Sequence, residues 1–200
     1  MIEERAEVAE TMLLSCGELG YVNVELLDVL ERSDCSRLRF YRLFTDKADC
    51  YTQAYGTEIE RLCDALLAAA AAEKSWRAGL RAALNDLALF IIVRPSLAKG
   101  LLVEVHSAGE PALAERTRML ARMTEAVDLA RAESDSPLSP PAITGEFLVS
   151  AIESTAARAL ASGEPTHFAR AVPDLAHLVV MAYFGRDAAR EELTPFLRSV

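Results

Sequence analysis

The sequence lacks the residue patterns that mark metal centres, disulfide-stapled domains and membrane proteins. It has no CxxC pair and no neighbouring histidines, and its four cysteines stand 13 to 19 residues apart. This spacing indicates neither a zinc site nor a disulfide framework. No apolar run reaches the ~18 residues that a membrane-spanning helix requires, and the acidic start lacks the features of a signal peptide. We expect a cytoplasmic protein with no bound metal and no contact with a membrane.

Basic residues are scarce as well. The chain has 21 lysines and arginines against 30 acidic residues, which gives a net charge of −9 and a pI near 4.9. This balance excludes a histone-like role and generic attraction to anionic membranes. Any contact with a nucleic acid must therefore be local. Two hundred residues, 52% of them hydrophobic, are enough for one or two domains with a sizeable core.

The motifs of common enzymes are missing too. The sequence contains no GxSxG elbow, no Walker loop, no GxGxxG turn and no HExxH pair. We therefore predict that the protein is not an enzyme and needs no cofactor. An all-helical enzyme with scattered catalytic groups is a distant alternative.

What the sequence does contain is a pair of short helices joined by a tight turn within residues 20–47. The second helix is expected at residues 37–44 with Ser36 as its N-cap. Its apolar residues Phe40, Leu43 and Phe44 fall at positions i, i+3 and i+4, so they should face the core. This arrangement is a helix-turn-helix, which places its second helix in the major groove of DNA.

The outward face of that second helix is cationic and aromatic, which suits phosphates and base edges. Lys47 follows in the first turn of the next helix, where a DNA phosphate would compensate its charge. The alternative is that the arginines simply form a solvated helix face. The predicted DNA-binding residues are Arg37, Leu38, Arg39, Tyr41, Arg42 and Lys47.

Charge is distributed unevenly over this region. Residues 1–35 hold two arginines against nine acidic residues, a net charge of −7, whereas residues 36–47 carry a net charge of +3. Few basic residues imply few phosphate contacts, so we expect weak binding to random DNA. Repulsion from distant carboxylates is screened beyond ~8 Å at physiological salt, so it does not prevent specific binding by a dimer.

The same region resembles the N-terminal domain of the tetracycline-repressor (TetR) family of bacterial regulators. The resemblance continues through residues 94–109 and 173–193, so it spans almost the whole chain. Three positions depart from the usual pattern, since Leu38 replaces a small residue, Val24 a threonine cap and Leu30 an alanine, and the N-terminal arm is acidic where the family commonly has a basic one. Asn23 is a candidate substitute for the missing cap. The motif residues are Gly20, Tyr21, Ser36, Phe40, Tyr41, Phe44, Asp46 and Lys47.

The resemblance implies an all-α fold with a three-helix DNA-binding domain at residues 1–47 and a helical effector-binding and dimerisation domain at residues 48–200. It also implies a homodimer on a palindromic double-stranded operator, acting as a repressor that a small, mostly apolar effector releases. The alternative is a degenerate relative that binds DNA weakly or not at all and serves as a small-molecule or protein-binding module.

Helical patterns fill the remaining chain. Residues 87–93 are apolar on all sides and should be buried, and the helix after residue 166 should break or kink at Pro173. The helices are expected at residues 47–73, 76–93, 95–106, 111–133, 142–162, 166–184 and 187–198, with a loop at 134–141.

Ligand and dimer contacts are harder to place from the sequence. Asn85, Glu104 and His106 are polar residues within apolar helices, where burial without a partner is costly, so we expect them to line a cavity. A satisfied core amide and a structural histidine are the alternatives. The last two major helices should form the dimer interface, with ordinary packing inside the chain as the alternative. The predicted ligand-binding residues are Asn85, Leu89, Leu102, Glu104, His106, Met119, Met123 and Phe147.

Overall fold

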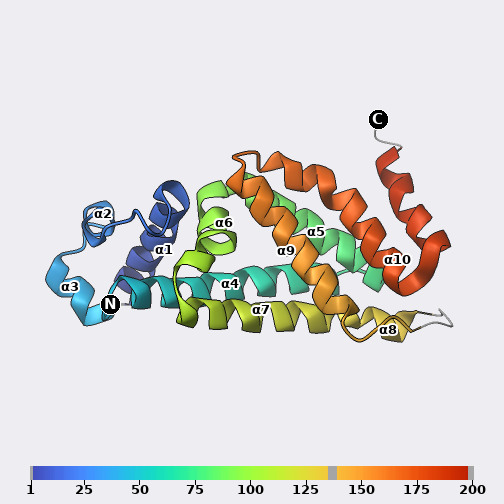
Figure 1. Cartoon of the computed structure of the whole chain (residues 1–200), viewed down its shortest axis with the longest axis horizontal. Coiled ribbons are helices and arrows are strands. Elements are labelled where there is room, and N and C mark those ends of the chain that lie inside the picture. Colours follow the sequence, from blue (N-terminus) through green and yellow to red (C-terminus); the bar gives the residue numbers. More distant parts are fainter. Residues whose placement is uncertain (1, 135–138, 198–200) are drawn as a thin grey trace. The chain divides into compact units, whose positions relative to one another are not determined.

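The computed structural model describes residues 2–134 and 139–197, with side chains described at 3–134 and 139–192. Every regular element in these ranges is a helix, which confirms the all-α prediction (Figure 1). The helices form two compact units: unit 1 comprises residues 1–62 and 94–119, and unit 2 comprises residues 63–93 and 120–200. The domain boundary that the sequence suggests after residue 47 stays a prediction.

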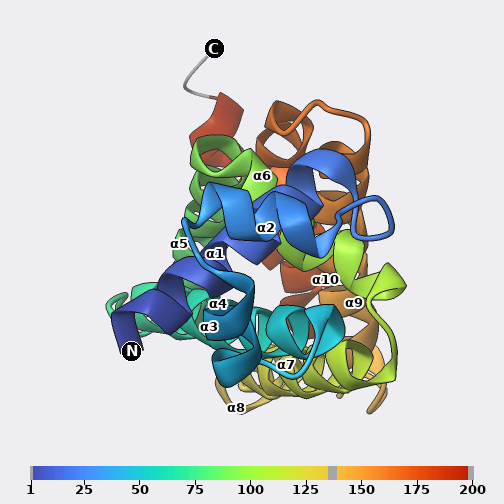
Figure 2. The same cartoon turned by 90° about the vertical axis from the view of Figure 1, so that its left-hand side faces the viewer.

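Unit 1 contains the helix-turn-helix. Helix α1 packs against α2 and α6, and Figure 2 shows α1, α2 and α3 together at the end of the unit that faces the viewer. Its elements are α1 (Ile2–Leu19), α2 (Leu26–Arg32), α3 (Arg37–Leu43), the first part of α4 (Lys47–Ala71), α6 (Pro95–Leu102), the 3₁₀ helix η1 (Glu104–Ser107) and the first part of α7 (Glu110–Asp128). Its fully buried side chains include Met12, Leu13, Phe40, Tyr51, Leu97 and Leu101.

The helix ends of unit 1 follow from local chemistry. Helix α1 ends because Gly20 adopts a φ of +87°, and its N–H donates back to the carbonyl of Cys16 at 2.8 Å. Helix α4 begins after Asp46, whose carboxylate accepts the N–H of Asp49 at 2.8 Å. Asp49 in turn accepts the N–H of Thr45 at 2.8 Å, so two unpaired donors are satisfied reciprocally.

Unit 2 is built around α10, which packs against α5 and α9. Ser75 caps α5 as predicted, because its hydroxyl accepts the N–H of Ala78 at 3.3 Å. The elements are the end of α4, α5 (Trp76–Val93), the end of α7, α8 (Ala130–Glu133), α9 (Thr144–Ala161) and α10 (Thr166–Leu197). Within the described ranges, none of the helices combines the length and the hydropathy needed to span a bilayer.

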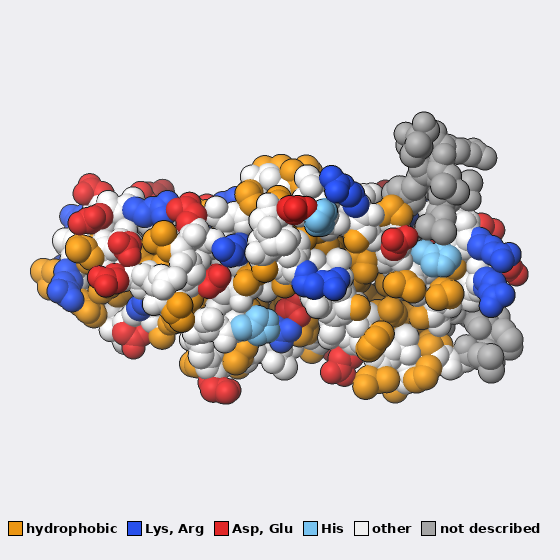
Figure 3. Space-filling model, turned by 45° about the horizontal axis from the view of Figure 1, so that its top comes forward, with side chains coloured by type: hydrophobic (Ala, Val, Ile, Leu, Met, Phe, Trp, Pro, Cys, Tyr) orange, Lys and Arg blue, Asp and Glu red, His pale blue; other side chains and the backbone are white. Residues whose placement is uncertain are grey.

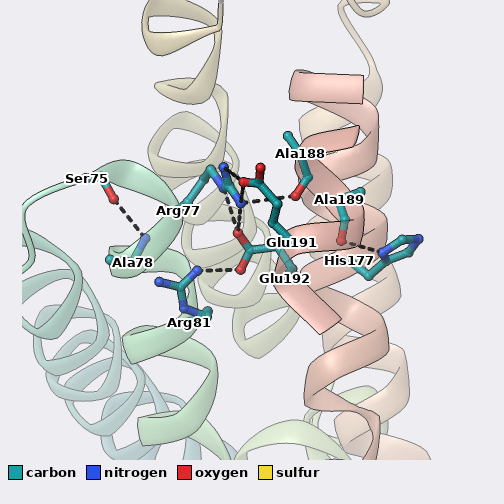
Figure 4. A network of polar contacts seen from close by, with 9 residues as sticks. All are labelled: Ser75, Arg77, Ala78, Arg81, His177, Ala188, Ala189, Glu191 and Glu192. Atoms are coloured by element: carbon teal, nitrogen blue, oxygen red, sulfur yellow. Dashed lines mark hydrogen bonds and ion pairs between the residues drawn. The ribbon is translucent and has the colours of Figure 1, made fainter. Parts of the chain in front are cut away.

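Helix α10 is interrupted at Gly185, in the gap between the helices predicted at 166–184 and 187–198, and the backbone is not broken at the predicted Pro173. Gly185 has φ +83° and ψ −177°, a conformation that is essentially restricted to glycine, whereas the backbone passes through Pro173 as helix. The segment after Gly185 is fixed to α5 by ion pairs. Arg77 and Arg81 point from α5 toward the fully buried carboxylate of Glu192 (Figure 4).

Two other expectations need correction. Residues 87–93 are not buried throughout, since Leu89, Ile92 and Val93 are exposed on the chain. The helix predicted at 95–106 ends at Leu102, because Val103 has a φ of −115° although its N–H still donates to the carbonyl of Lys99 at 3.0 Å. The chain continues as η1, in which the N–H of Ala108 donates to the carbonyl of Val105, three residues earlier. The loop predicted at 134–141 lies partly outside the described residues, which resume at 139.

Candidate nucleic-acid interface

Helix α3 presents five of the six predicted DNA-binding residues to solvent. Phe40 and Phe44 are buried as the periodicity predicts, with ring centroids 5.4 Å apart. In Figure 3 the end of unit 1 that carries α3 shows basic and hydrophobic side chains side by side. The exposed residues are Arg37, Leu38, Arg39, Tyr41 and Arg42.

The turn before α3 sets the direction of this face. Asp34 has a φ of +47°, in the left-handed region that aspartate tolerates better than most residues. The chain then reverses so that the N–H of Cys35 reaches the carbonyl of Leu30 at 3.0 Å. The hydroxyl of Ser36 accepts the N–H of Arg39 at 3.3 Å, which confirms Ser36 as the N-cap.

The three arginines of α3 are largely free of internal partners. Arg39 approaches Glu4 of α1 at 3.5 Å, but its side chain remains 63% exposed. Such an exposed pair contributes at most ~1 kcal/mol. Within the part of the chain that the structure describes, Arg37 and Arg42 form no ion pair. All three guanidinium groups are therefore available to an anionic partner.

Lys47 is held by unit 1 itself. Its ammonium group donates to the carbonyls of Tyr21 at 2.5 Å and Val24 at 2.7 Å, and it lies 4.2 Å from the centroid of the Tyr21 ring. These carbonyl oxygens satisfy the ammonium group within unit 1, so its place at the start of α4 does not require a phosphate. Lys47 fixes the turn between α1 and α2, and a contact with DNA stays a prediction.

The same turn is tied to the segment that follows α6. The carboxylate of Glu104 accepts the backbone N–H of Tyr21 at 2.7 Å, a contact across 83 residues that no sequence pattern indicates. Asn23 does not replace the missing helix cap. Its side chain donates to the carbonyl of Leu19 at the end of α1, at 2.8 Å, while the N–H of Glu25 is accepted by Asp28 at the start of α2.

Helices α1 and α6 cross with their backbones in direct contact. A Cβ built on Gly17 would overlap the carbonyl of Ser96, and one built on Gly100 would overlap the carbonyl of Leu13. The hydroxyl of Tyr51 also donates to the Gly100 carbonyl at 2.6 Å. Burial raises the pKa of the nearby Cys16 thiol to about 12. This crossing was not predicted from the sequence, although a glycine inside each of two helices is a signal for close backbone approach.

The predicted ligand-binding residues divide between the two units. Leu102, Glu104, His106 and Met119 belong to unit 1, and Asn85, Leu89, Met123 and Phe147 belong to unit 2. Leu102 is buried and the two methionines are partly buried. The premise that the polar residues are buried is wrong for Asn85 and His106, which are exposed. Glu104 is partly buried and bonded to Tyr21. Their role in ligand binding stays a prediction.

The predicted dimer helices contain both packed and exposed apolar residues. Ala156 and Ala159 of α9 and Leu175 and Val179 of α10 are buried within the chain. Ordinary packing therefore accounts for them. Among the side chains that the structure describes, the exposed large apolar residues of these two helices are Phe147, Leu178 and Met181.

Solved structures share this fold. FadR from Bacillus halodurans, a fatty acid degradation regulator, matches with a TM-score of 0.77 and 11% identity over 88% of this chain and 94% of its own. The transcriptional regulator FadR from Bacillus subtilis, in complex with stearoyl-CoA, matches with a TM-score of 0.75 and 10% identity over 88% and 97%. A TetR-family regulator from Marinobacter aquaeolei VT8 matches with a TM-score of 0.67 and 18% identity over 87% and 95%.

No protein-family model matches the sequence, and no curated protein does. The structural matches nevertheless cover most of both chains in each comparison. The chain has the fold of the TetR-family transcriptional regulators.

Proposed function

We propose that the protein is a DNA-binding transcriptional regulator, and specifically a homodimeric repressor that a small apolar effector releases from a palindromic operator. The observation that carries this proposal is the exposed face of α3. Three arginines and a tyrosine stand in solvent above the buried Phe40, on the helix that a helix-turn-helix inserts into the major groove.

The charge of the chain supports specific binding over general attraction to DNA. Each neutralised phosphate contributes ~0.9 to the slope of log affinity against log salt. If every arginine of α3 met a phosphate, a dimer would neutralise about six, so the slope would not exceed about 5. This is a modest electrostatic contribution, and base contacts must supply the selectivity.

A dimer is needed because one α3 reads only a few base pairs. Two such helices bind half-sites about one helical turn, ~34 Å, apart. Phe147 of α9 is 71% exposed, and Leu178 and Met181 of α10 are also exposed. Exposed apolar residues of this size on the surface of a single chain support contact with a second copy.

An apolar effector is supported by the match to a regulator in complex with stearoyl-CoA. The α1–α6 crossing supports a route from effector to DNA within unit 1, because α6 cannot shift along α1 without moving the α1 backbone that it touches at Leu13 and Gly17. The effector would release DNA to the extent that it binds the DNA-free arrangement more tightly.

The first experiment is selection of duplexes from a random library by the full chain, followed by fluorescence anisotropy on the enriched duplex. The Arg39→Ala, Arg42→Ala double variant should lose at least tenfold in affinity, because charged hydrogen bonds to bases or phosphates contribute about 1–3 kcal/mol each. The matched control is Arg61→Ala, Arg118→Ala. It removes the same charge from exposed positions on α4 and α7 and should leave affinity within about threefold. Equal losses in the two variants would contradict the proposal.

The second experiment tests effector coupling with stearoyl-CoA as the probe. Its affinity for the protein is measured with and without the enriched duplex. Thermodynamic reciprocity requires that a probe which weakens DNA binding be weakened by DNA to the same factor. Identical affinities in the two titrations would exclude release by this probe.

A further inference from the structure

Leu38 is the most exposed large apolar residue of α3. It lies one residue before Arg39 and one turn before Arg42, and 67% of its surface is exposed. A lone exposed leucine needs no special explanation, but this leucine stands among the cations of the proposed reading face. The question is which partner accepts a branched alkyl group at that place.

The neighbours of Leu38 define a small apolar area inside a cationic rim. Tyr41 lies at i+3 and is 51% exposed, so it shares the outer face of the helix with Leu38. Its ring packs edge-on against Phe40, with centroids 5.6 Å apart, which fixes its direction. The arginines on either side would meet anionic or hydrogen-bonding groups, and the leucine would not.

The major groove of DNA offers one apolar group to such a side chain, the C5 methyl group of thymine. Apart from the smaller C5–H edge of cytosine, the base edges there present hydrogen-bond donors and acceptors, which a leucine would cover without satisfying. A leucine in the groove therefore favours a thymine and disfavours bases that present amino or keto groups at the same place.

We infer that Leu38 is a specificity-determining residue of α3 that contacts the C5 methyl group of a thymine in each half-site. This inference rests on the proposed function. It goes beyond it by naming the base and the atom that the residue reads, and it assigns the flanking arginines to the phosphates or base edges on either side.

The experiment removes the methyl group without changing base pairing. The duplex enriched from a random library by the full chain is remade with each thymine in turn replaced by deoxyuridine, and affinities are measured by anisotropy. Wild-type protein should lose about fourfold at one thymine per half-site, as expected when one methyl group is no longer buried, and should be unaffected at the others. The Leu38→Ala variant should bind the thymine and uracil duplexes equally.

Two controls separate the possible outcomes. Leu38 is exposed and alanine favours helix, so Leu38→Ala should keep the wild-type circular dichroism spectrum. Leu27→Ala changes an exposed leucine of α2 and should preserve the fourfold difference at the sensitive thymine. A library that yields no enriched sequence would overturn both the proposed function and this inference. An enriched duplex with no uracil-sensitive thymine, or a thymine preference that persists in Leu38→Ala, would overturn this inference alone.

Discussion

Replacing Gly100 by alanine should destabilise the protein, although alanine is the better helix former. A Cβ at this position would lie 3.2 Å from the carbonyl carbon of Leu13. Its distance to the carbonyl oxygen of Leu13 would be shorter than 3.0 Å, a separation that real Cβ atoms essentially never show. These are backbone atoms of α1, so no side chain can rotate away. Helices α1 and α6 must separate, and the bond from Tyr51 to the Gly100 carbonyl is strained with them.

The size of the effect follows from opposing contributions. Overpacking of this kind costs about 1–3 kcal/mol, and a disturbed hydrogen bond costs about 1 kcal/mol. The gain in helix propensity on replacing glycine by alanine offsets about 1 kcal/mol. The free energy of unfolding should therefore fall by about 1–3 kcal/mol, as measured by urea titration with circular dichroism detection.

Gly56→Ala is the matched control in the same unit. Gly56 lies inside α4, and its nearest neighbour would be the flexible side chain of Glu115 at an ordinary 3.6 Å. Here only the propensity gain remains, so the free energy of unfolding should rise by about 0.5–1 kcal/mol. A Gly100→Ala variant as stable as the wild type, or the same sign of change in both variants, would refute the reasoning about the α1–α6 crossing.

Three other substitutions test separate electrostatic features. Glu192→Gln should lower the free energy of unfolding by about 1–3 kcal/mol in urea titrations, because it leaves Arg77 and Arg81 without their buried anion. The control Glu191→Gln changes a side chain that is 71% exposed and should cost under about 0.5 kcal/mol. Equal costs in the two variants would contradict this prediction. Glu4→Gln should raise the affinity for the enriched duplex by up to about fivefold at low salt and by less at high salt, because it removes the carboxylate that pairs with Arg39. Weaker binding by this variant would contradict the prediction and show that Glu4 positions the arginine. Burial alone would raise the pKa of Asp49, but hydrogen bonds from Thr45 and Gln53 together hold this pKa below its usual value. The ionised carboxylate therefore contributes to the stability of the fold at neutral pH, and this contribution is lost as the pH falls below about 4. Asp49→Asn should therefore be less stable at pH 7 but lose less stability between pH 5 and 3, and parallel acid-unfolding curves would argue against it.

The sequence predicted the helix-turn-helix well because its determinants are local. Ser36 caps the helix it precedes, and the i, i+3, i+4 pattern correctly buries Phe40 and Phe44. The boundaries of α4 and α5 were also close, since Asp46 and Ser75 act on the turn that follows them. Short-range hydrogen bonding and periodicity decide these features.

Errors arose where distant contacts decide the outcome. The carbonyls that hold Lys47 come from a turn more than twenty residues earlier, so its position alone suggested an unpaired cation. The exposed Asn85 was expected to be buried because its neighbours in sequence are apolar. The break predicted at Pro173 does not occur, whereas the gap left between the helices predicted at 166–184 and 187–198 coincides with the interruption at Gly185.

The central claim is that α3 reads a DNA sequence, and the ratio of two affinities tests it most directly. Full-length protein is titrated at 0.15 M salt against the duplex enriched by selection and against a shuffled duplex of the same length and composition. Sequence-specific readers typically prefer their site by ~10³ or more, and this account predicts a ratio in that range for the wild type. A ratio near one would contradict the claim, because the exposed arginines of α3 would then be no more than a solvated surface.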